Sequence, residues 1–306
     1  MQKARQANGL PYGFGAILIW STSSPSLVSL PGLPAPQLLF WTHLVASLVL
    51  NGWATWRQGP RPMLAELGRL GWRVWAYGLL GIYVYQMGYV LGLKLAPPAE
   101  ANLLNYLWPL FTAVFAVPIR HERSGPSLWL ALACGLAGVS VLITGPSSGS
   151  YPWRWAGYIA ALIGALSWGL YSNLLAGLKQ DALTLQRAYV LIGVVAFPLT
   201  GLLTDSLGGW PAWDSLGTLL YIGCGPLAGA ALCWQEAMRR GPVQRIAAIS
   251  YLTPVLSTLW LSVLFQAPLT ANVVVGLVLV LIAAALPSSS LFRVWGRRLL
   301  LGRILD

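Results

Sequence analysis

Amide side chains occur inside long apolar stretches of this sequence, where each amide requires a hydrogen-bonding partner. Asn102 and Asn105 are three residues apart, and Gln86 lies in another apolar stretch. In a helix the two asparagines would share a face. Serine and threonine hydroxyls can bond to their own helix, but the amides need other partners. This favours Asn105 and Gln86 as residues that line a pathway rather than as packing residues.

Aromatic rings accompany these amides at helical spacing. Tyr83 and Tyr89 flank Gln86 at three residues on either side. Amides bond to ammonium and carboxylate groups, and rings receive an apolar side chain or a cation. The combination suits a neutral, amphiphilic small molecule. The candidate binding residues from this pattern are Trp20, Ser21, Tyr83, Gln86, Tyr89, Asn102, Asn105, Trp168, Tyr171 and Ser250, with Thr112, Thr253 and Ser257 near the same faces.

Ionisable groups are sparse within the apolar stretches. Glu100 follows Pro97-Pro98, so it would lie in the first turn of a helix, where the helix dipole favours a carboxylate. We interpret Glu100 as a capping residue in preference to a proton relay. We interpret His43 as a neutral packing residue in preference to a proton carrier. No acid falls in the middle of a stretch, so strong proton coupling has no obvious carrier.

Motifs typical of enzymes are missing from the sequence. It contains no GxxxxGK[ST] and no HExxH, and no GxSxG with catalytic partners. The three cysteines lie in apolar stretches without metal-ligand spacing, and two histidines cannot form a metal site on their own. The sequence therefore predicts no enzyme activity, no catalytic residue, no metal and no cofactor.

The composition indicates a protein that folds in lipid. Of 306 residues 57% are hydrophobic and only 9% are charged, and the mean hydropathy is +0.66. A helix crosses the hydrocarbon core in about 20 residues, so we predict an all-α integral membrane protein with ten transmembrane helices. The predicted spans are 9–30, 35–56, 74–95, 99–119, 127–144, 153–178, 183–203, 216–238, 246–265 and 272–287.

Basic residues set the expected orientation. With a cytoplasmic N-terminus, 17 of the 19 Lys and Arg fall on the cytoplasmic side, and only Lys94 and Arg154 fall outside. Both termini are then cytoplasmic, and the net charge of +11 is a topology signal rather than a nucleic-acid surface. The basic tail Leu291–Asp306 is expected to form an amphipathic helix on the inner leaflet.

The chain contains a weak internal repeat. At a constant offset of 145 residues, Tyr106 matches Tyr251 and Pro109 matches Pro254. We predict two five-helix halves, residues 1–148 and 149–306, and the odd number of spans inverts the second half. Pro109 and Pro254 would kink spans four and nine. They are candidate hinges for alternating access, although membrane helices also carry proline for packing alone.

Several short motifs carry a resemblance to a known family. They are the Leu-x-Trp of spans one and six, Trp20-Ser21-Thr22, Asn105-Tyr106-Leu107-Trp108-Pro109, and the run from Ser250 to Ser257. They resemble the drug/metabolite transporter superfamily of the EamA type, and within it the bacterial exporters of aromatic amino acids. The resemblance implies an inner-membrane exporter of aromatic and other neutral amino acids, together with cationic drugs, and adds Trp108 and Tyr251 to the candidate binding residues.

Other functions stay open at this point. The first alternative is a multidrug or other small-metabolite exporter of the same superfamily. A membrane-embedded enzyme would need a cluster of acids, histidines or metal ligands. A structural or receptor role would not need symmetric kinked helices. The expected partners are a neutral or aromatic amino acid and membrane lipid, without nucleic acid, and the substrate range, proton coupling and oligomeric state are left undetermined.

Overall fold

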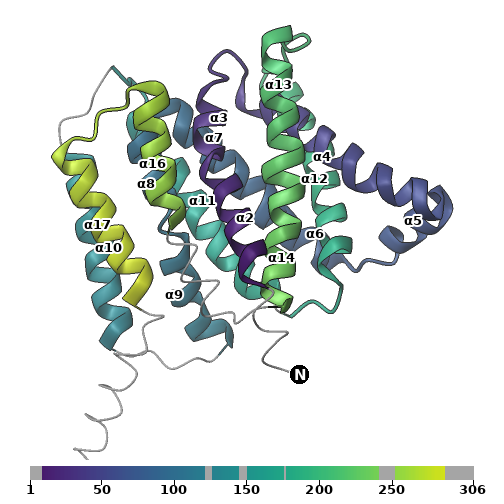
Figure 1. The fold of residues 1–306 in the computed structure, drawn as a ribbon, viewed down its shortest axis with the longest axis horizontal. Helices are drawn as coiled ribbons and strands as arrows, with labels where there is room; N and C mark the ends of the chain where they lie inside the picture. Colours follow the sequence, from purple (N-terminus) through teal and green to yellow (C-terminus); the bar gives the residue numbers. More distant parts are fainter. Residues whose placement is uncertain (1–8, 121–125, 145–149, 176, 241–251, 287–306) are drawn as a thin grey trace, which may run out of the picture.

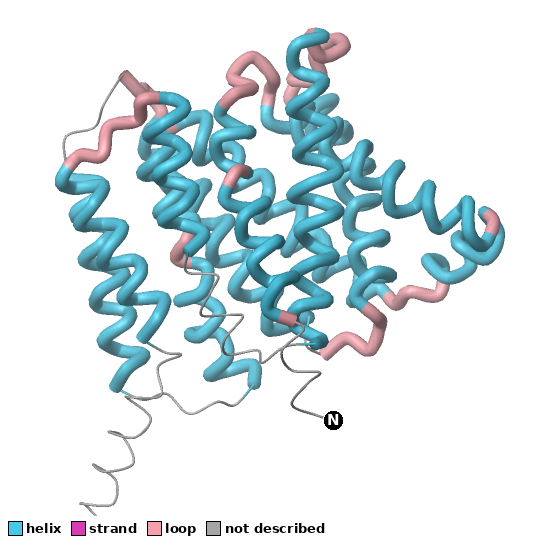
Figure 2. The backbone as a smooth tube through the Cα atoms, in the orientation of Figure 1, coloured by secondary structure: helices cyan, strands magenta, loops and turns pink. Residues whose placement is uncertain are grey.

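The computed structural model describes residues 9–120, 126–144, 150–175, 177–240 and 252–286. Throughout these ranges the regular elements are helices, joined mostly by short loops (Figures 1 and 2). This confirms the all-helical prediction. The tail Leu291–Asp306 lies outside the described residues.

The elements follow the predicted spans closely. In the first half they are α2 (Leu10–Ser21), α3 (Ser23–Val28), α4 (Ala35–Gln58), α5 (Pro60–Gly68), α6 (Trp72–Gly78), η1 (Leu79–Val84), α7 (Tyr85–Leu95), α8 (Pro98–Asn105), α9 (Trp108–Arg120) and α10 (Pro126–Thr144). In the second half they are α11 (Arg154–Leu175), α12 (Ala182–Leu203), α13 (Trp213–Ile222), η2 (Gly223–Ala230), α14 (Ala231–Arg240), α16 (Leu252–Phe265) and α17 (Ala271–Ala285).

Five helical stretches within the described ranges are long and apolar enough to cross a membrane. They are Ala35–Gln58, Pro98–Ile119, Arg154–Leu175, Ala182–Leu203 and Trp213–Trp234. Shorter apolar helices include Leu252–Phe265 and Ala271–Ala283. The short helix α5 was not predicted, although Pro60 at its first position is a typical helix start. The count of ten spans and their inversion stays a prediction.

Two of the expected spans are interrupted where the sequence is polar or aromatic. The first breaks at Thr22, whose hydroxyl donates to the Ile19 carbonyl oxygen at 2.7 Å. The fourth breaks at Tyr106 and Leu107, between α8 and α9. Span four is thus interrupted just before Pro109, where a proline kink was expected, and the hinge role of Pro109 stays a prediction. Pro109 is the second residue of α9, where its missing N–H leaves no helical bond unmade. Pro254 likewise lies in the first turn of α16 as described.

The third and eighth segments each contain a π-helix, which the sequence analysis did not predict. The element η1 joins α6 to α7, and η2 joins α13 to α14. The wider turn of a π-helix rotates the following residues relative to an α-helical register, and such turns are frequent at functional sites. In η2 the chain also contains Pro226, which cannot donate a backbone hydrogen bond.

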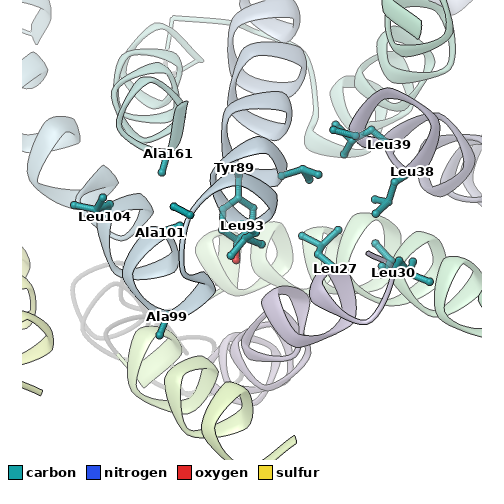
Figure 3. Packing of buried hydrophobic residues seen from close by; sticks show 14 of the residues in the cluster. Leu27, Leu30, Leu38, Leu39, Tyr89, Leu93, Ala99, Ala101, Leu104 and Ala161 are labelled. Carbon is teal, nitrogen blue, oxygen red and sulfur yellow. The ribbon is translucent and has the colours of Figure 1, made fainter. Parts of the chain in front are cut away.

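The core forms where α7 and α8 pack against α11, α3 and α4. Tyr89, Ala101 and Leu104 from the first two helices lie near Ala161 of α11 (Figure 3), with Leu27 of α3 in the same cluster. The α7–α11 contact is close because α7 presents glycine. A Cβ atom at Gly88 would lie 2.5 Å from the Ala160 carbonyl oxygen and 2.9 Å from the Gly164 nitrogen. Backbone therefore packs on backbone at this contact.

This close approach predicts the effect of a single methyl group. Gly88→Ala must push α7 away from α11 and should lower the stability of the folded protein by about 1–3 kcal/mol. Gly52→Ala is the matched control, because a Cβ at Gly52 of α4 meets no atom within 4 Å. Thermal unfolding in detergent measures both. Equal melting temperatures for the two variants would contradict the close α7–α11 contact.

Candidate substrate-binding site

A chain of hydrogen bonds joins three helices at the centre of the molecule. The Tyr89 hydroxyl of α7 donates to Asn102 Oδ1 of α8 at 2.9 Å, and Asn102 Nδ2 donates to Ser257 Oγ of α16 at 2.9 Å. Ser257 donates in turn to the Pro254 carbonyl oxygen at 3.2 Å. Asn102 is fully buried, and both its amide oxygen and its amide nitrogen are hydrogen-bonded to protein side chains. The contact links the two halves of the chain.

Next to this chain lie two buried acceptors without a donor in hydrogen-bonding geometry among the described residues. Asn105, one turn beyond Asn102, is 2% exposed; its side chain interacts with the Tyr85 hydroxyl, but its Oδ1 meets no donor in hydrogen-bonding geometry among the described residues. The Ser24 hydroxyl of α3 is also buried; it lies beside the Tyr89 hydroxyl, without a partner in hydrogen-bonding geometry within the described ranges. An unsatisfied buried polar atom costs about 1–3 kcal/mol. Such an atom in a cluster that is otherwise paired is available to a donor on a ligand.

Aromatic rings form a wall beside these acceptors. The Tyr85 ring lies 4.5 Å from the Trp168 ring between centroids, and it stacks on Tyr89 at 6.1 Å. Trp168 contacts Trp108 edge-on at 6.3 Å and Tyr171 at 5.3 Å. The wall therefore draws on α7, α9 and α11. We call the rings and the two asparagines, together with Ser24 and Ser257, the central cluster.

The central cluster contains six of the predicted site residues. They are Tyr89, Asn102, Asn105, Trp108, Trp168 and Tyr171. Tyr85 was missed because the three-residue spacing of Tyr83, Gln86 and Tyr89 was taken as one face. The π-helix η1 ends at Val84 and changes the register there. The four-residue spacing of Tyr85 and Tyr89 was the signal that could have found it.

Tyr83 lies apart from the central cluster, because its side chain is directed to α12. Its hydroxyl lies 2.7 Å from Thr200 Oγ1, and its ring stacks on Phe197 at 5.3 Å. His43 packs on the same Phe197 at 5.0 Å and donates from Nδ1 to the Leu39 carbonyl oxygen at 2.8 Å. A histidine that is 1% exposed in such contacts fits the packing interpretation. Gln86 is half-buried and makes no hydrogen bond to another described residue.

Trp20 and Ser21 form a second group around the η2 segment. Trp20 Nε1 donates to the Pro226 carbonyl oxygen at 3.0 Å, and its ring lies 5.4 Å from Trp234. Ser21 Oγ accepts from Trp260 Nε1 at 3.3 Å. These contacts tie α2 to η2, α14 and α16. The predicted site residues Ser250 and Tyr251 lie outside the described residues.

Glu100 lies in the first turn of α8, as predicted, and is 2% exposed. The Tyr158 hydroxyl of α11 donates to its carboxylate. Its observed partner is thus a side chain of another helix rather than the backbone of its own first turn.

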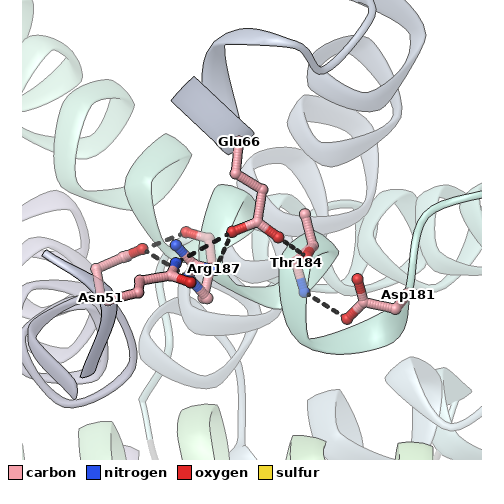
Figure 4. A network of polar contacts seen from close by, with 6 residues as sticks. Asn51, Glu66, Asp181, Thr184 and Arg187 are labelled. Carbon is pink, nitrogen blue, oxygen red and sulfur yellow. Dashed lines mark hydrogen bonds and ion pairs between the residues drawn. The ribbon is translucent and has the colours of Figure 1, made fainter. Parts of the chain in front are cut away.

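A polar network at the N-terminal end of α12 was not predicted (Figure 4). Arg187 forms an ion pair with Glu66 of α5 at 2.6 Å, and its side chain is 4% exposed. Arg187 Nε donates to Asn51 Oδ1 of α4 at 3.3 Å, and the Thr184 hydroxyl donates to Glu66 at 2.7 Å. The network connects three helices. The sequence analysis had considered Arg187 only as one of the basic residues that set the expected orientation of the chain.

Together, the apolar helices and the buried site of amides and rings define a membrane transporter. Residues 7–144 and 155–289 match the EamA-like transporter family. The chain belongs to this family.

Individual relatives agree with this assignment. The chain is similar to the aromatic amino acid exporter YddG of Ancylobacter novellus, with 33% identity over 84% of this chain and 88% of that protein. YddG of Salmonella typhimurium is 28% identical over 61% of this chain and 66% of its own length. One crystal structure, 31% identical, matches with a TM-score of 0.67 and covers 96% of this chain and 99% of that chain.

The ion pair of the α12 network predicts a pH dependence of stability. Hydrogen bonds from Thr184 and Arg187 lower the pKa of Glu66 below its ordinary value of 4.5. A carboxylate with a lowered pKa stabilises the folded state above its unfolded pKa, and loses that effect as the pH falls through the folded pKa. Glu66→Gln should therefore lower stability at pH 7 by about 1–2 kcal/mol, a value reduced for the exposure of Glu66.

The difference between wild type and Glu66→Gln should shrink as the pH drops below about 4.5, because Glu66 becomes neutral. The control is Asp214→Asn, which changes an exposed acid outside the network. Thermal unfolding across pH measures all three proteins. A Glu66→Gln deficit that is absent at pH 7, or that is constant with pH, would rule out the ion pair as a stabilising contact.

Proposed function

We propose that this protein exports aromatic and other neutral amino acids from the bacterial cytoplasm across the inner membrane. The observation that carries the proposal is the buried Asn105 amide beside a wall of aromatic rings: it interacts with Tyr85, but its Oδ1 lacks a donor in hydrogen-bonding geometry among the described residues. An ammonium group would donate to this oxygen and to Ser24 Oγ, while an aromatic side chain would stack on Tyr85 and Trp168. Two relatives that carry the name of aromatic amino acid exporter support this choice of substrate.

The packing of the central cluster bears on how a substrate enters. Tyr85 and Trp168 are already in ring contact at 4.5 Å, so a ligand must displace one of them. Trp168 lies on α11 and Tyr85 directly follows η1, at the start of α7. Because backbone contact at Gly88 holds α7 against α11, we infer that a change at η1, which directly precedes Tyr85, opens the site. Gln86, half-buried beside Tyr85, then has an amide free to take part.

The proposed mechanism is alternating access between two inverted five-helix halves, residues 1–148 and 149–306. The pairing of helices supports it. In one half-set α11 contacts η1, α7 and α9, and in the other α2 contacts η2, α14 and α16. In the predicted repeat, each element of the first set of contacts corresponds to an element of the second set, so the two sets are equivalent. The contacts α4–α12 and α10–α17 each join two corresponding helices. The π-helices in the third and eighth segments repeat in the same way.

Within this mechanism we keep Pro109 and Pro254 as hinge residues. Pro109 is the second residue of α9, two positions after the break at Tyr106 and Leu107, and Pro254 lies within the described part of α16. A break in the helix, with proline after it, allows rotation without loss of a helical hydrogen bond. The distribution of Lys and Arg supports cytoplasmic termini.

The alternative is an exporter of cationic drugs or other small metabolites in the same superfamily. The aromatic wall favours it to some degree, since rings also bind cations. An amino acid differs from such a drug because its carboxylate needs hydrogen-bond donors, in addition to the acceptors that its ammonium group needs. The Asn105 and Gln86 amides can supply both.

Substitutions in the central cluster should separate these functions. Asn105→Ala removes this acceptor and should lower the affinities for phenylalanine and for leucine by the same factor of about five, which is the effect of one lost hydrogen bond. Trp168→Ala removes a ring and should lower the affinity for phenylalanine more than the affinity for leucine. Ser172→Ala is the control, because its hydroxyl bonds to the Trp168 carbonyl oxygen of its own helix at 2.7 Å. Transport by purified protein in liposomes, with labelled substrates, measures each affinity.

The amino acid proposal fails if wild-type protein in liposomes carries neither phenylalanine nor leucine. If it carries a cationic drug instead, the alternative holds. If Asn105→Ala and Trp168→Ala both transport with wild-type affinity, the central cluster is not the binding site, whatever the substrate is.

A further inference from the structure

The segment from the end of α4 to the start of α6 exposes three tryptophan side chains. Trp53 is 46% exposed, Trp56 82% and Trp72 72%. In Figure 1 this segment projects from the body of the molecule, with α5 at its far end. Tryptophan prefers the boundary between hydrocarbon and headgroups, since its ring is apolar and its N–H is polar. The segment is thus suited to that depth of a membrane.

Arginine side chains lie against these rings. The Arg57 guanidinium lies 5.3 Å from the Trp53 ring centre, and that of Arg73 lies 5.8 Å from the Trp72 ring centre. Arg61 and Arg69 in the same segment are also exposed. We call Trp53, Trp56, Arg57, Arg61, Trp72 and Arg73 the Arg–Trp surface.

Along the chain, the segment that carries this surface contains few acids. Between residues 57 and 73 the one acidic residue is Glu66, and its charge is taken up by Arg187 in the α12 network. A guanidinium group presents a planar set of donors that matches phosphate oxygens. The neighbouring ring limits the freedom of each guanidinium, so less entropy is lost when it binds.

Tryptophans at the other end of α12 have the opposite surroundings. Trp210 is 85% exposed and Trp213 is 88% exposed. The acids Asp205 and Asp214 are their neighbours in the chain. Exposed indole rings therefore occur in both places, but Trp210 and Trp213 have acids as neighbours in the chain, whereas the Arg–Trp surface has arginines.

We propose that the Arg–Trp surface is a binding site for the headgroups of acidic phospholipids. The guanidinium groups of Arg57 and Arg73 each donate to a lipid phosphate, and the neighbouring indole rings lie against the glycerol and upper acyl chain. Because Glu66 ties α5 to α12, lipid bound here holds the junction of α4, α5 and α12 together. The site is independent of the transported substrate, so its failure would leave the proposed transport function untouched.

The test compares lipids on the purified full-length protein in detergent. Phosphatidylglycerol and phosphatidylcholine of equal chain length are titrated, and bound lipid is counted by native mass spectrometry alongside the melting temperature. Wild type should prefer phosphatidylglycerol and be stabilised by it. In the double variant Arg57→Gln/Arg73→Gln the preference for phosphatidylglycerol should fall at least about fivefold, because basic residues close to acidic lipid attract its headgroups. Both positions are exposed, so the variant should fold.

Two controls isolate the surface. Arg154→Gln removes a guanidinium that stacks on Trp155 at 5.4 Å in the same manner but at the start of α11. Lys179→Gln removes an exposed charge from the loop before α12. Both should keep the wild-type preference. The proposal is overturned if wild type shows no preference, if the double variant keeps it, if either control loses it equally, or if soluble glycerol phosphate displaces the lipid at matched concentration.

Discussion

The amide of Asn102 is the contact on which the centre of this transporter depends. It accepts from Tyr89 and donates to Ser257, so a single side chain joins α7, α8 and α16 across the two halves of the chain. In a membrane interior no water replaces a lost partner, and each such group must be satisfied by protein. The position of α8 then fixes Asn105 one turn further on, where its Oδ1 lacks a donor in hydrogen-bonding geometry among the described residues.

The helices around this centre hold it by close backbone packing and leave other parts able to move. Gly88 brings α7 onto α11 with backbone in contact, and this places Tyr85 against Trp168. The break at Tyr106 and Leu107 and the π-helices η1 and η2 interrupt the regular ladders nearby. The α12 network adds an ion pair at one end of the molecule, where α5 meets α12.

Much of the fold could be predicted from the sequence, because hydropathy and proline placement determine where a membrane helix begins and ends. Asn102 and Asn105 were predicted as candidate site residues because polar groups in apolar helices are costly, and Trp168 because aromatic rings accompany these amides. Tyr85 was not, because the three-residue spacing of Tyr83, Gln86 and Tyr89 was followed instead of the four-residue spacing of Tyr85 and Tyr89, and the sequence analysis did not predict η1. The partnership of Glu66 with Arg187 was missed for a similar reason, as it joins residues 121 positions apart. Ser250 and Tyr251 remain predictions.

The most direct measurement of the central claim is photolabelling with a phenylalanine that carries a diazirine on its ring. Wild-type protein in liposomes would be irradiated with this substrate, digested and sequenced by mass spectrometry. The account predicts label on the peptides that contain Tyr85 and Trp168, suppressed by excess unlabelled phenylalanine. Label confined to other segments, or label that excess phenylalanine does not suppress, would contradict a substrate site at the central cluster.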